Sequence, residues 1–176
     1  MQDFPKYSSK QRWIHWSSMI LVITVIMLLV LKVTMAYVIG GMTMVYLLHK
    51  SLGIMVFIFT IWRIIVIYRQ VAPDVLSKDE KLARILAKST QGFIYILLLV
   101  APLSGYLMSG RDLNVFGLIS VPAIAMPNST HQMFHSMHLI SAYILAILVI
   151  IHILGALYHY FWLKDKVLQS MLSCND

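Results

Sequence analysis

Four long apolar segments dominate this chain of 176 residues. Each approaches or exceeds the roughly 20 residues that cross the hydrocarbon core of a bilayer as a helix. In lipid, backbone polar groups must bond within their own segment, so long uniform runs of this kind form helices. Only 12% of the residues are charged, whereas a soluble domain carries about 25%. We therefore predict an all-α, integral membrane four-helix bundle, one domain over residues 1–176 with helices at about 13–36, 45–67, 92–108 and 137–163.

The distribution of Lys and Arg predicts how these helices are oriented. Cytoplasmic segments of membrane proteins carry an excess of basic residues. Only Lys32, Lys50 and Arg111 lie on one side of the predicted spans, out of 14 basic residues in all. We therefore expect both termini in the cytoplasm. The other side holds 11 basic residues: Lys6, Lys10, Arg12, Arg63, Arg69, Lys78, Lys81, Arg84, Lys88, Lys164 and Lys166.

Two histidines on the last predicted helix, His138 and His152, are fourteen residues apart. That spacing is nearly four turns, so both side chains project from one face, about 21 Å apart along the axis. Ionisable side chains at membrane depth are costly and usually functional, and a neutral imidazole is a common axial ligand of haem iron. The pair indicates two haems, one near each membrane surface. The only cysteine, Cys174, cannot form the Cys-x-x-Cys-His motif, so the haems are expected to be bound non-covalently.

Two further histidines lie at depths that match this pair. His15 is near the cytoplasmic end of the first segment and His49 near the outer end of the second. We expect His49 to pair with His138, and His15 with His152. His159 lies on the same stripe as His152, but a His138–His159 spacing would place the haems about 31 Å apart and slow transfer between them. We therefore assign His152 as the ligand and leave His159 for another role.

Arg63, and the pair of His131 and His135, can each be interpreted as structural residues or as part of a binding site. Arg63 closes the second segment on the cytoplasmic side, as an interfacial anchor or as a contact to a haem propionate or a quinone. His131 and His135 share a helical face with His138. We interpret that stripe as an amphipathic start of the last helix, with a zinc or copper site as the alternative.

Several motifs in this chain together resemble the bacterial cytochrome b561 family of small di-haem membrane cytochromes. The resemblance runs nearly from end to end, and its strongest part is the last helix with His138, His152 and His159. The other matching segments are Trp13-Ile14-His15-Trp16, His49-Lys50-Ser51-Leu52-Gly53, Arg63 with Arg69, Tyr95 through Pro102 to Gly105, and Tyr160-Phe161-Trp162-Leu163-Lys164-Asp165.

The resemblance implies a set of ligands and an activity. It implies two haem b groups, each with two histidine ligands, at His15, His49, His138 and His152. It also implies a ubiquinone pocket on the cytoplasmic side with His159 close to it. The implied role is to pass electrons across the bacterial inner membrane between an outer donor, superoxide among them, and ubiquinone. The apolar connection 33–44 lacks basic residues that would attract an anionic donor, which favours quinone-linked transfer over superoxide oxidation.

Two rival functions remain open from the sequence. One is a haem-bearing membrane anchor subunit of a larger respiratory oxidoreductase. The other is a metal-ion transporter built on the histidine stripe. A transporter is expected to place acidic residues inside the membrane, and none of the seven Asp and Glu residues falls within a predicted span. The main prediction is therefore an electron-transfer protein or quinone-linked oxidoreductase, with no role in nucleic-acid binding.

Overall fold

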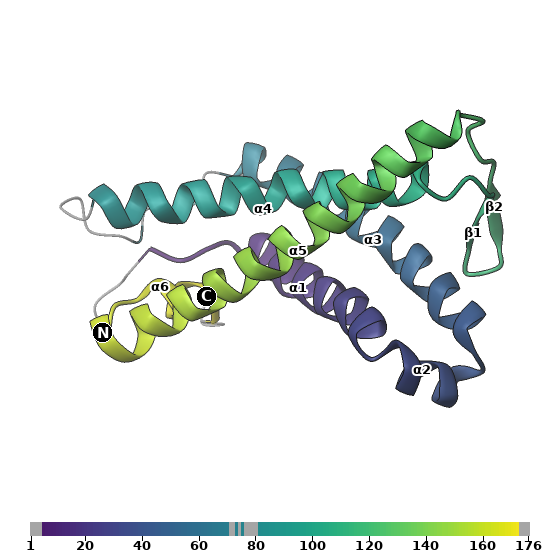
Figure 1. The fold of residues 1–176 in the computed structure, drawn as a ribbon. Helices are drawn as coiled ribbons and strands as arrows, with labels where there is room; N and C mark the ends of the chain where they lie inside the picture. The colour runs from purple at the N-terminus through teal and green to yellow at the C-terminus, as the bar shows by residue number, and fades with distance from the viewer. Residues whose placement is uncertain (1–4, 71–72, 74, 76–80, 173–176) are drawn as a thin grey trace.

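Four long helices form the body of the molecule in a computed structural model that describes residues 5–70, 73, 75 and 81–172 (Figure 1). They are α1 (Ser9–Val30), α3 (Met42–Arg69), α4 (Lys81–Leu107) and α5 (Asn128–Tyr158). A π-helical turn, η1 (His159–Leu163), continues α5, and a short α6 (Val167–Leu172) follows. Each of the four spans is long and apolar enough to cross a membrane. The predicted all-α membrane bundle is confirmed.

The helix ends differ from the predicted ones where polar residues extend a helix beyond the apolar core. The third span begins at Lys81 and not near residue 92, because Arg84 and Lys88 lie on an amphipathic first half that hydropathy alone does not identify. The last span begins at Asn128 and not near residue 137, for the same reason. Lys78 and Cys174 lie outside the described residues.

The first predicted helix is interrupted. The helix α1 ends at Val30, and the chain resumes after Leu31 as α2 (Lys32–Ile39). Gly40 and Gly41 then take left-handed φ angles of 97° and 109°, which glycine adopts without strain. The chain reverses there into α3. The apolar connection of the sequence is thus a separate short helix that packs against α3.

A small hairpin forms part of the connection between α4 and α5. Its strands, β1 (Leu113–Val115) and β2 (Ile119–Val121), pair antiparallel with Asn114 opposite Ser120. No feature noted in the sequence predicted it. The hairpin is fixed to α3 by Ser51, whose hydroxyl accepts the Phe116 N–H at 2.8 Å.

The helices pair α1 with α3 and α4 with α5, and α3 also packs on α4. At one end of the bundle, Gln11 Nε2 donates to the Gln70 carbonyl at 2.8 Å, and Trp16 Nε1 donates to the Met171 carbonyl at 3.1 Å. At the other end, Lys50 Nζ donates to Ser109 Oγ at 2.9 Å. The beginning of α1 therefore lies at the same end as the end of α3 and α6.

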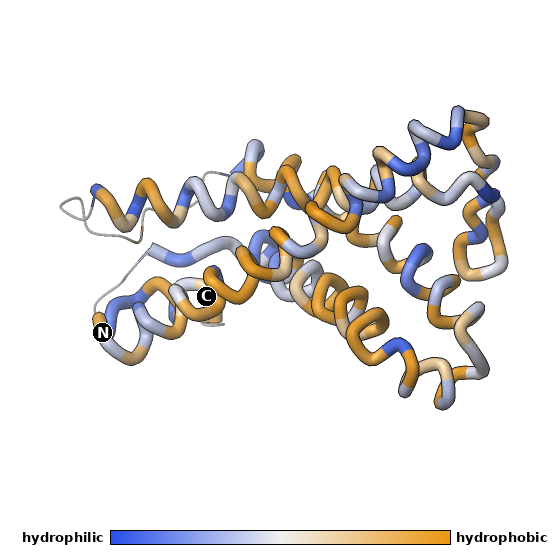
Figure 2. Tube along the Cα trace, in the orientation of Figure 1, coloured by the Kyte–Doolittle hydropathy of each residue, from blue (hydrophilic) through white to orange (hydrophobic). Residues whose placement is uncertain are grey.

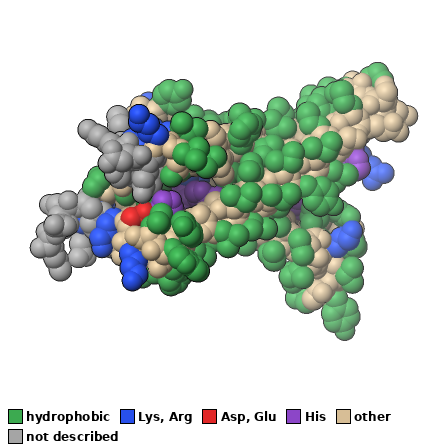
Figure 3. Space-filling view, turned by 60° about the vertical axis from the view of Figure 1, so that its left-hand side comes forward, with side chains coloured by type: hydrophobic (Ala, Val, Ile, Leu, Met, Phe, Trp, Pro, Cys, Tyr) green, Lys and Arg blue, Asp and Glu red, His purple; other side chains and the backbone are tan. Residues whose placement is uncertain are grey.

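Hydrophobic residues occur along all the long helices (Figure 2), and their side chains cover most of the face of the bundle seen in Figure 3. This is expected of a protein surrounded by lipid, because burying apolar surface away from lipid gains no hydrophobic free energy. The interior instead holds small hydroxyl residues that let helices approach closely. Ser18, Thr60 and Ser104 are buried, and each hydroxyl bonds a carbonyl one turn earlier in its own helix.

Candidate functional site

The four histidines chosen from the sequence form two pairs inside the bundle. His15 of α1 faces His152 of α5, with ring centres 6.3 Å apart. His49 of α3 faces His138 of α5, with ring centres 6.2 Å apart. Because both pairs share α5, they are stacked along one helix at different membrane depths. The structure therefore brings together the residues that the sequence predicted to pair.

These separations fit a metal ion held between each pair of imidazoles. Histidine nitrogen binds transition metals at about 2.0–2.1 Å, so two rings on opposite sides of one iron have centres about 6.3 Å apart. The two rings are steeply inclined to each other, by 63° for His15–His152 and 84° for His49–His138. Such rings do not stack on one another. Each pair has the spacing of a bis-histidine site.

The environment of His138 fixes which nitrogen is available to a metal. Its Nδ1–H donates to the Ala101 carbonyl at 2.8 Å. Nε2 therefore keeps its lone pair, as in metal sites where a backbone carbonyl orients the ligating ring. Gly105 on the same helix as Ala101 makes room for the ring. A Cβ at Gly105 would lie 3.0 Å from both Cε1 and Nδ1 of His138.

His49 has an unsatisfied nitrogen, and open space lies next to it. Its Nδ1 is buried and makes no hydrogen bond of good geometry to the described residues, although the Val25 backbone is near enough to interact with the ring. A buried polar atom without a partner is costly unless a ligand or ion satisfies it. Gly53 lies one turn along α3, and no atom beyond its chain neighbours and the nearby helix backbone lies within 4 Å of a Cβ built on it. Gly155 has the same open space on α5, one turn from His152. Unfilled space beside ligand-type histidines suits a flat macrocycle.

Arg63 lies at the His15–His152 pair. It donates to Nδ1 of His15 at 2.7 Å, and its guanidinium carbon is 5.0 Å from the centre of the Tyr95 ring. Both contacts are to groups that carry no negative charge. Tyr7, just before α1, is close enough to interact with the same guanidinium. Burial raises the pKa of Tyr7, and the charge of Arg63 opposes that rise. A permanent cation therefore faces the His15–His152 pair.

An apolar layer separates the two histidine pairs. Val22, Val56, Leu98 and Leu145 form one buried cluster, with one residue from each long helix. Val22 lies seven residues after His15, and Val56 seven after His49. Leu145 lies midway between His138 and His152. Seven residues are about two turns, so this layer is centred between the pairs.

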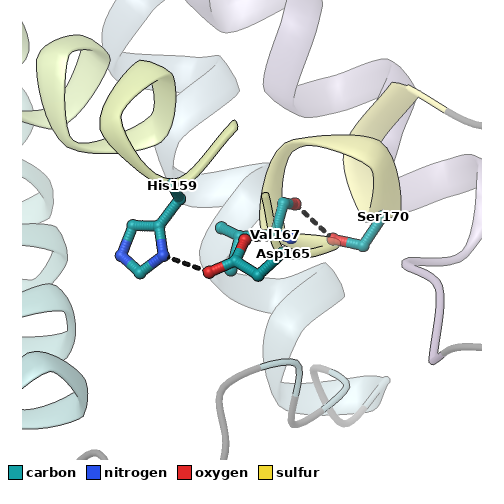
Figure 4. A network of polar contacts seen from close by, with 4 residues as sticks. All are labelled: His159, Asp165, Val167 and Ser170. Carbon is teal, nitrogen blue, oxygen red and sulfur yellow. Dashed lines mark hydrogen bonds and ion pairs between the residues drawn. The ribbon is translucent and has the colours of Figure 1, made fainter. Parts of the chain in front are cut away.

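His159 occupies a separate position, seven residues beyond His152. It begins the π-helical turn and forms an ion pair with Asp165 through Nδ1 (Figure 4). Its side chain is 17% exposed. Figure 3 shows histidine surface beside acidic surface at this end of the molecule. Aromatic rings flank it on the chain, with Tyr158 and Trp162 stacked at 5.9 Å.

The stripe formed by His131 and His135 does not assemble a metal site in the described residues. No group of three potential ligands lies close enough there to hold an ion. Nδ1 of His131 donates to the Leu107 carbonyl at 3.0 Å, which ties the beginning of α5 to the end of α4. His135 is exposed. The stripe lies within α5 as an extension of that helix beyond its apolar part.

A family model described as prokaryotic cytochrome b561 matches residues 6–173. The chain belongs to this family. As a member of the cytochrome b561 family, the protein is a haem-dependent electron-transfer protein that crosses the bacterial inner membrane several times.

Two relatives illustrate the similarity. The protein named cytochrome b561 homolog 2 of Escherichia coli (strain K12) is 32% identical over 166 residues, which cover 90% of this chain and 86% of the relative. A protein of Yersinia pestis named probable superoxide oxidase CybB is 27% identical over 175 residues, covering 95% of this chain and 96% of the relative.

Several residues that support the histidines lie in the segments that resemble the family, but the sequence did not predict their contacts. Gly105 belongs to the segment that resembles the family, but its contact with His138 cannot be read from the chain. The supporting roles of Ala101, Gly53 and Gly155 are equally invisible there. Asp165 ends a motif that resembles the family, and its six-residue distance from His159 conceals their contact.

Proposed function

We propose that this member of the cytochrome b561 family carries electrons across the inner membrane, from a donor on the periplasmic side to ubiquinone on the cytoplasmic side. His49 with His138 and His15 with His152 would each hold one haem b. The observation that carries the proposal is the pair of facing histidine pairs at two depths of α5. Bound haem supplies reversible one-electron transfer.

The paired imidazoles also restrict the chemistry. With two histidines holding each haem, the iron would have no coordination position left for oxygen. Bis-histidine sites are therefore suited to electron transfer. The hydrogen bond from His138 to the Ala101 carbonyl holds one ligand in the metal-binding tautomer before the cofactor arrives.

Arg63 supports the inner site through its charge. An arginine side chain only donates hydrogen bonds and stays protonated. While it donates to Nδ1 of His15, that ring keeps its proton on Nε2, the nitrogen that haem histidines use. Iron binding at Nε2 requires Arg63 to release the ring. A haem propionate or a quinone oxygen is the acceptor that we assign to the released guanidinium.

His159 serves the quinone end of this proposal. Reduction of ubiquinone to ubiquinol takes two electrons and two protons, and haem sites deliver only electrons. Histidine exchanges protons near neutral pH. His159 lies one heptad beyond His152, about 10 Å along the helix, and its ring is partly exposed. It is therefore placed to pass protons to an acceptor near the inner pair.

The donor on the periplasmic side is proposed only by chemical class. A one-electron donor is required, and superoxide is a candidate because the Yersinia pestis relative is named a probable superoxide oxidase. In this chain α2 contributes one lysine, Lys32, to that side, and Lys50 is engaged by Ser109. Few basic side chains are therefore placed to attract an anion.

The test combines cofactor counting with quinone kinetics on the purified protein. We expect two haems per chain by pyridine haemochrome, and anaerobic oxidation of the reduced protein by ubiquinone-1. His138→Ala should retain one haem, whereas the exposed control His135→Ala should retain two. His159→Ala should retain both and be oxidised more slowly. One haem in the intact protein, or no oxidation by quinone, would contradict the proposal. Loss of the inner haem in His159→Ala would make His159 a ligand.

A further inference from the structure

The chain reverses sharply after α5 and returns an acidic side chain to His159. The π-helical turn ends at Lys164, which takes a left-handed φ of 52°. The Asp165 N–H then donates to the His159 carbonyl at 3.3 Å. A non-glycine residue in this region is uncommon and costs about 1 kcal/mol or more, so the surrounding contacts must hold it. The result of the turn is that Asp165 faces His159.

Both carboxylate oxygens of Asp165 are engaged (Figure 4). Oδ2 contacts Nδ1 of His159, and Oδ1 accepts the Val167 N–H at 3.0 Å. Ser170, which is buried, donates its hydroxyl to the Val167 carbonyl at 2.6 Å. The Tyr7 N–H donates to the Ser170 carbonyl at 3.3 Å and anchors this turn to the beginning of the chain. The carboxylate that contacts His159 therefore has little freedom to move.

The contact determines which nitrogen of His159 exchanges protons. An ionised carboxylate only accepts hydrogen bonds, so Nδ1 of His159 must carry a proton to bond with it. Nε2 is then the nitrogen that gains and loses a proton. Of the acidic residues, only Asp112 and Asp165 fall in the described part of the chain, and Asp165 alone contacts a histidine there.

We propose that Asp165 is a positioning residue for proton delivery to ubiquinone, an inference that rests on the function proposed above. It holds His159 with Nδ1–H toward the carboxylate and Nε2 toward the acceptor. For each proton delivered, the Nε2–H bond of the doubly protonated ring breaks and a bond to a quinone oxygen forms. The neutral ring retains Nδ1–H and takes a new proton from cytoplasmic water. Two such deliveries match the two electrons received from the haem sites, giving ubiquinol.

Substitutions at position 165 separate this role from a second one. Asp165 also caps α6, because its Oδ1 accepts the N–H of Val167, the first residue of that helix. Asp165→Asn keeps an oxygen for the Val167 N–H but presents an N–H donor to His159, which forces the opposite tautomer. Asp165→Ser also retains an acceptor for the cap but has no group that reaches the ring. Asp112→Asn is the matched control, because Asp112 Oδ1 likewise accepts a backbone N–H, from Ala123 at 2.9 Å.

The measurements are quinone oxidation of the reduced holoprotein and ¹⁵N NMR of labelled histidine. The His159 signal is identified by its loss in His159→Ala. We expect Asp165→Asn and Asp165→Ser to slow oxidation by ubiquinone-1 about tenfold, the lower end of the effect of removing the hydrogen-bond partner of a metal-ligating histidine. Both should keep wild-type haem spectra, and Asp165→Asn should move the His159 proton from Nδ1 to Nε2. The control should match wild type in every measurement.

Three results would overturn the inference. They are wild-type oxidation rates in both Asp165 variants, an unchanged His159 tautomer in Asp165→Asn, and loss of haem from both variants, which would make Asp165 a structural residue. Failure of the proposed function looks different, because the wild-type protein itself would then not be oxidised by ubiquinone-1.

Discussion

Small residues determine how closely the histidines can be held. Gly105 of α4 lies against the imidazole of His138, where even a methyl group would be 3.0 Å from two ring atoms. Ala101, one turn earlier, provides the carbonyl that the same ring bonds. Position and tautomer of one imidazole are thus fixed by two residues of a neighbouring helix.

Gly105→Val should therefore disrupt the outer pair. The added side chain displaces the His138 ring from the Ala101 carbonyl, and the haem content should fall from two per chain to one by pyridine haemochrome. Leu103→Ala is the control, because Leu103 is on the same helix with 49% of its surface exposed. A Gly105→Val protein that retains two haems with unchanged spectra would show that His138 does not need this space.

At this scale the sequence predicted which histidines come together better than it predicted the residues that support them. Ionisable side chains inside a span stand out, because burying them is costly, and so His15, His49, His138 and His152 were recognised. The contact of Arg63 with His15 joins residues 48 positions apart. The residue pattern within one helix does not predict a contact between two helices. The supports depend on how helices face each other, which a single chain pattern does not encode.

Among the elements, the β1–β2 hairpin has the most specific attachment. Ser51 is fully buried beside His49 and Lys50, and its hydroxyl accepts the Phe116 N–H while donating to the Leu47 carbonyl. One side chain thus joins the outer end of α3 to the loop between α4 and α5. The hairpin is held over the end of the bundle that contains the His49–His138 pair.

Ser51→Ala should loosen the hairpin without unfolding the bundle. Losing the hydroxyl leaves the Phe116 N–H without its partner, at a cost of about 1 kcal/mol. Hydrogen–deuterium exchange in the peptide that covers 113–121 should quicken about fivefold, which is the equivalent of that cost. Ser120→Ala, at an exposed position of β2, should leave the exchange near wild type. Unchanged exchange in Ser51→Ala would mean that other contacts hold the hairpin.

Element boundaries were predictable only where hydropathy changes sharply. The π-helical turn, the break at Leu31 and the hairpin depend on local backbone conformation, such as the positive φ angles of Phe116 and Gly117 in the hairpin turn. The beginnings of α4 and α5 were not predicted because their first turns are polar. A hydropathy criterion detects only the apolar part of a helix. The number and type of the spanning helices were nevertheless correct, because lipid leaves the backbone few alternatives.

The whole molecule has one end that joins the N-terminal segment, the end of α3 and α6, and another that carries the hairpin. The excess of basic residues at the first end predicts that it faces the cytoplasm. This arrangement of ends follows the up-and-down order expected for four consecutive spans joined by short connections.

Reporter fusions test that orientation. Alkaline phosphatase, which folds only in the periplasm, should be inactive when fused after Asp176 and active when inserted after Gly117 in the hairpin. Green fluorescent protein fused after Asp176 should fluoresce. Active phosphatase at Asp176 would reverse the assignment of the two sides, and with it the side proposed for ubiquinone.

The apolar layer of Val22, Val56, Leu98 and Leu145 has an electrical consequence. It contains no ionisable side chain to carry protons between the two histidine pairs, so an electron that crosses this depth moves uncompensated charge. The pairs are about 21 Å apart along α5, roughly two-thirds of a hydrocarbon core about 30 Å thick. A full crossing involves about 2.3 kcal/mol per charge at 100 mV, and this depth therefore involves about 1.5 kcal/mol. The voltage across the membrane thereby becomes part of the driving force, opposing electron flow toward one face and assisting it toward the other.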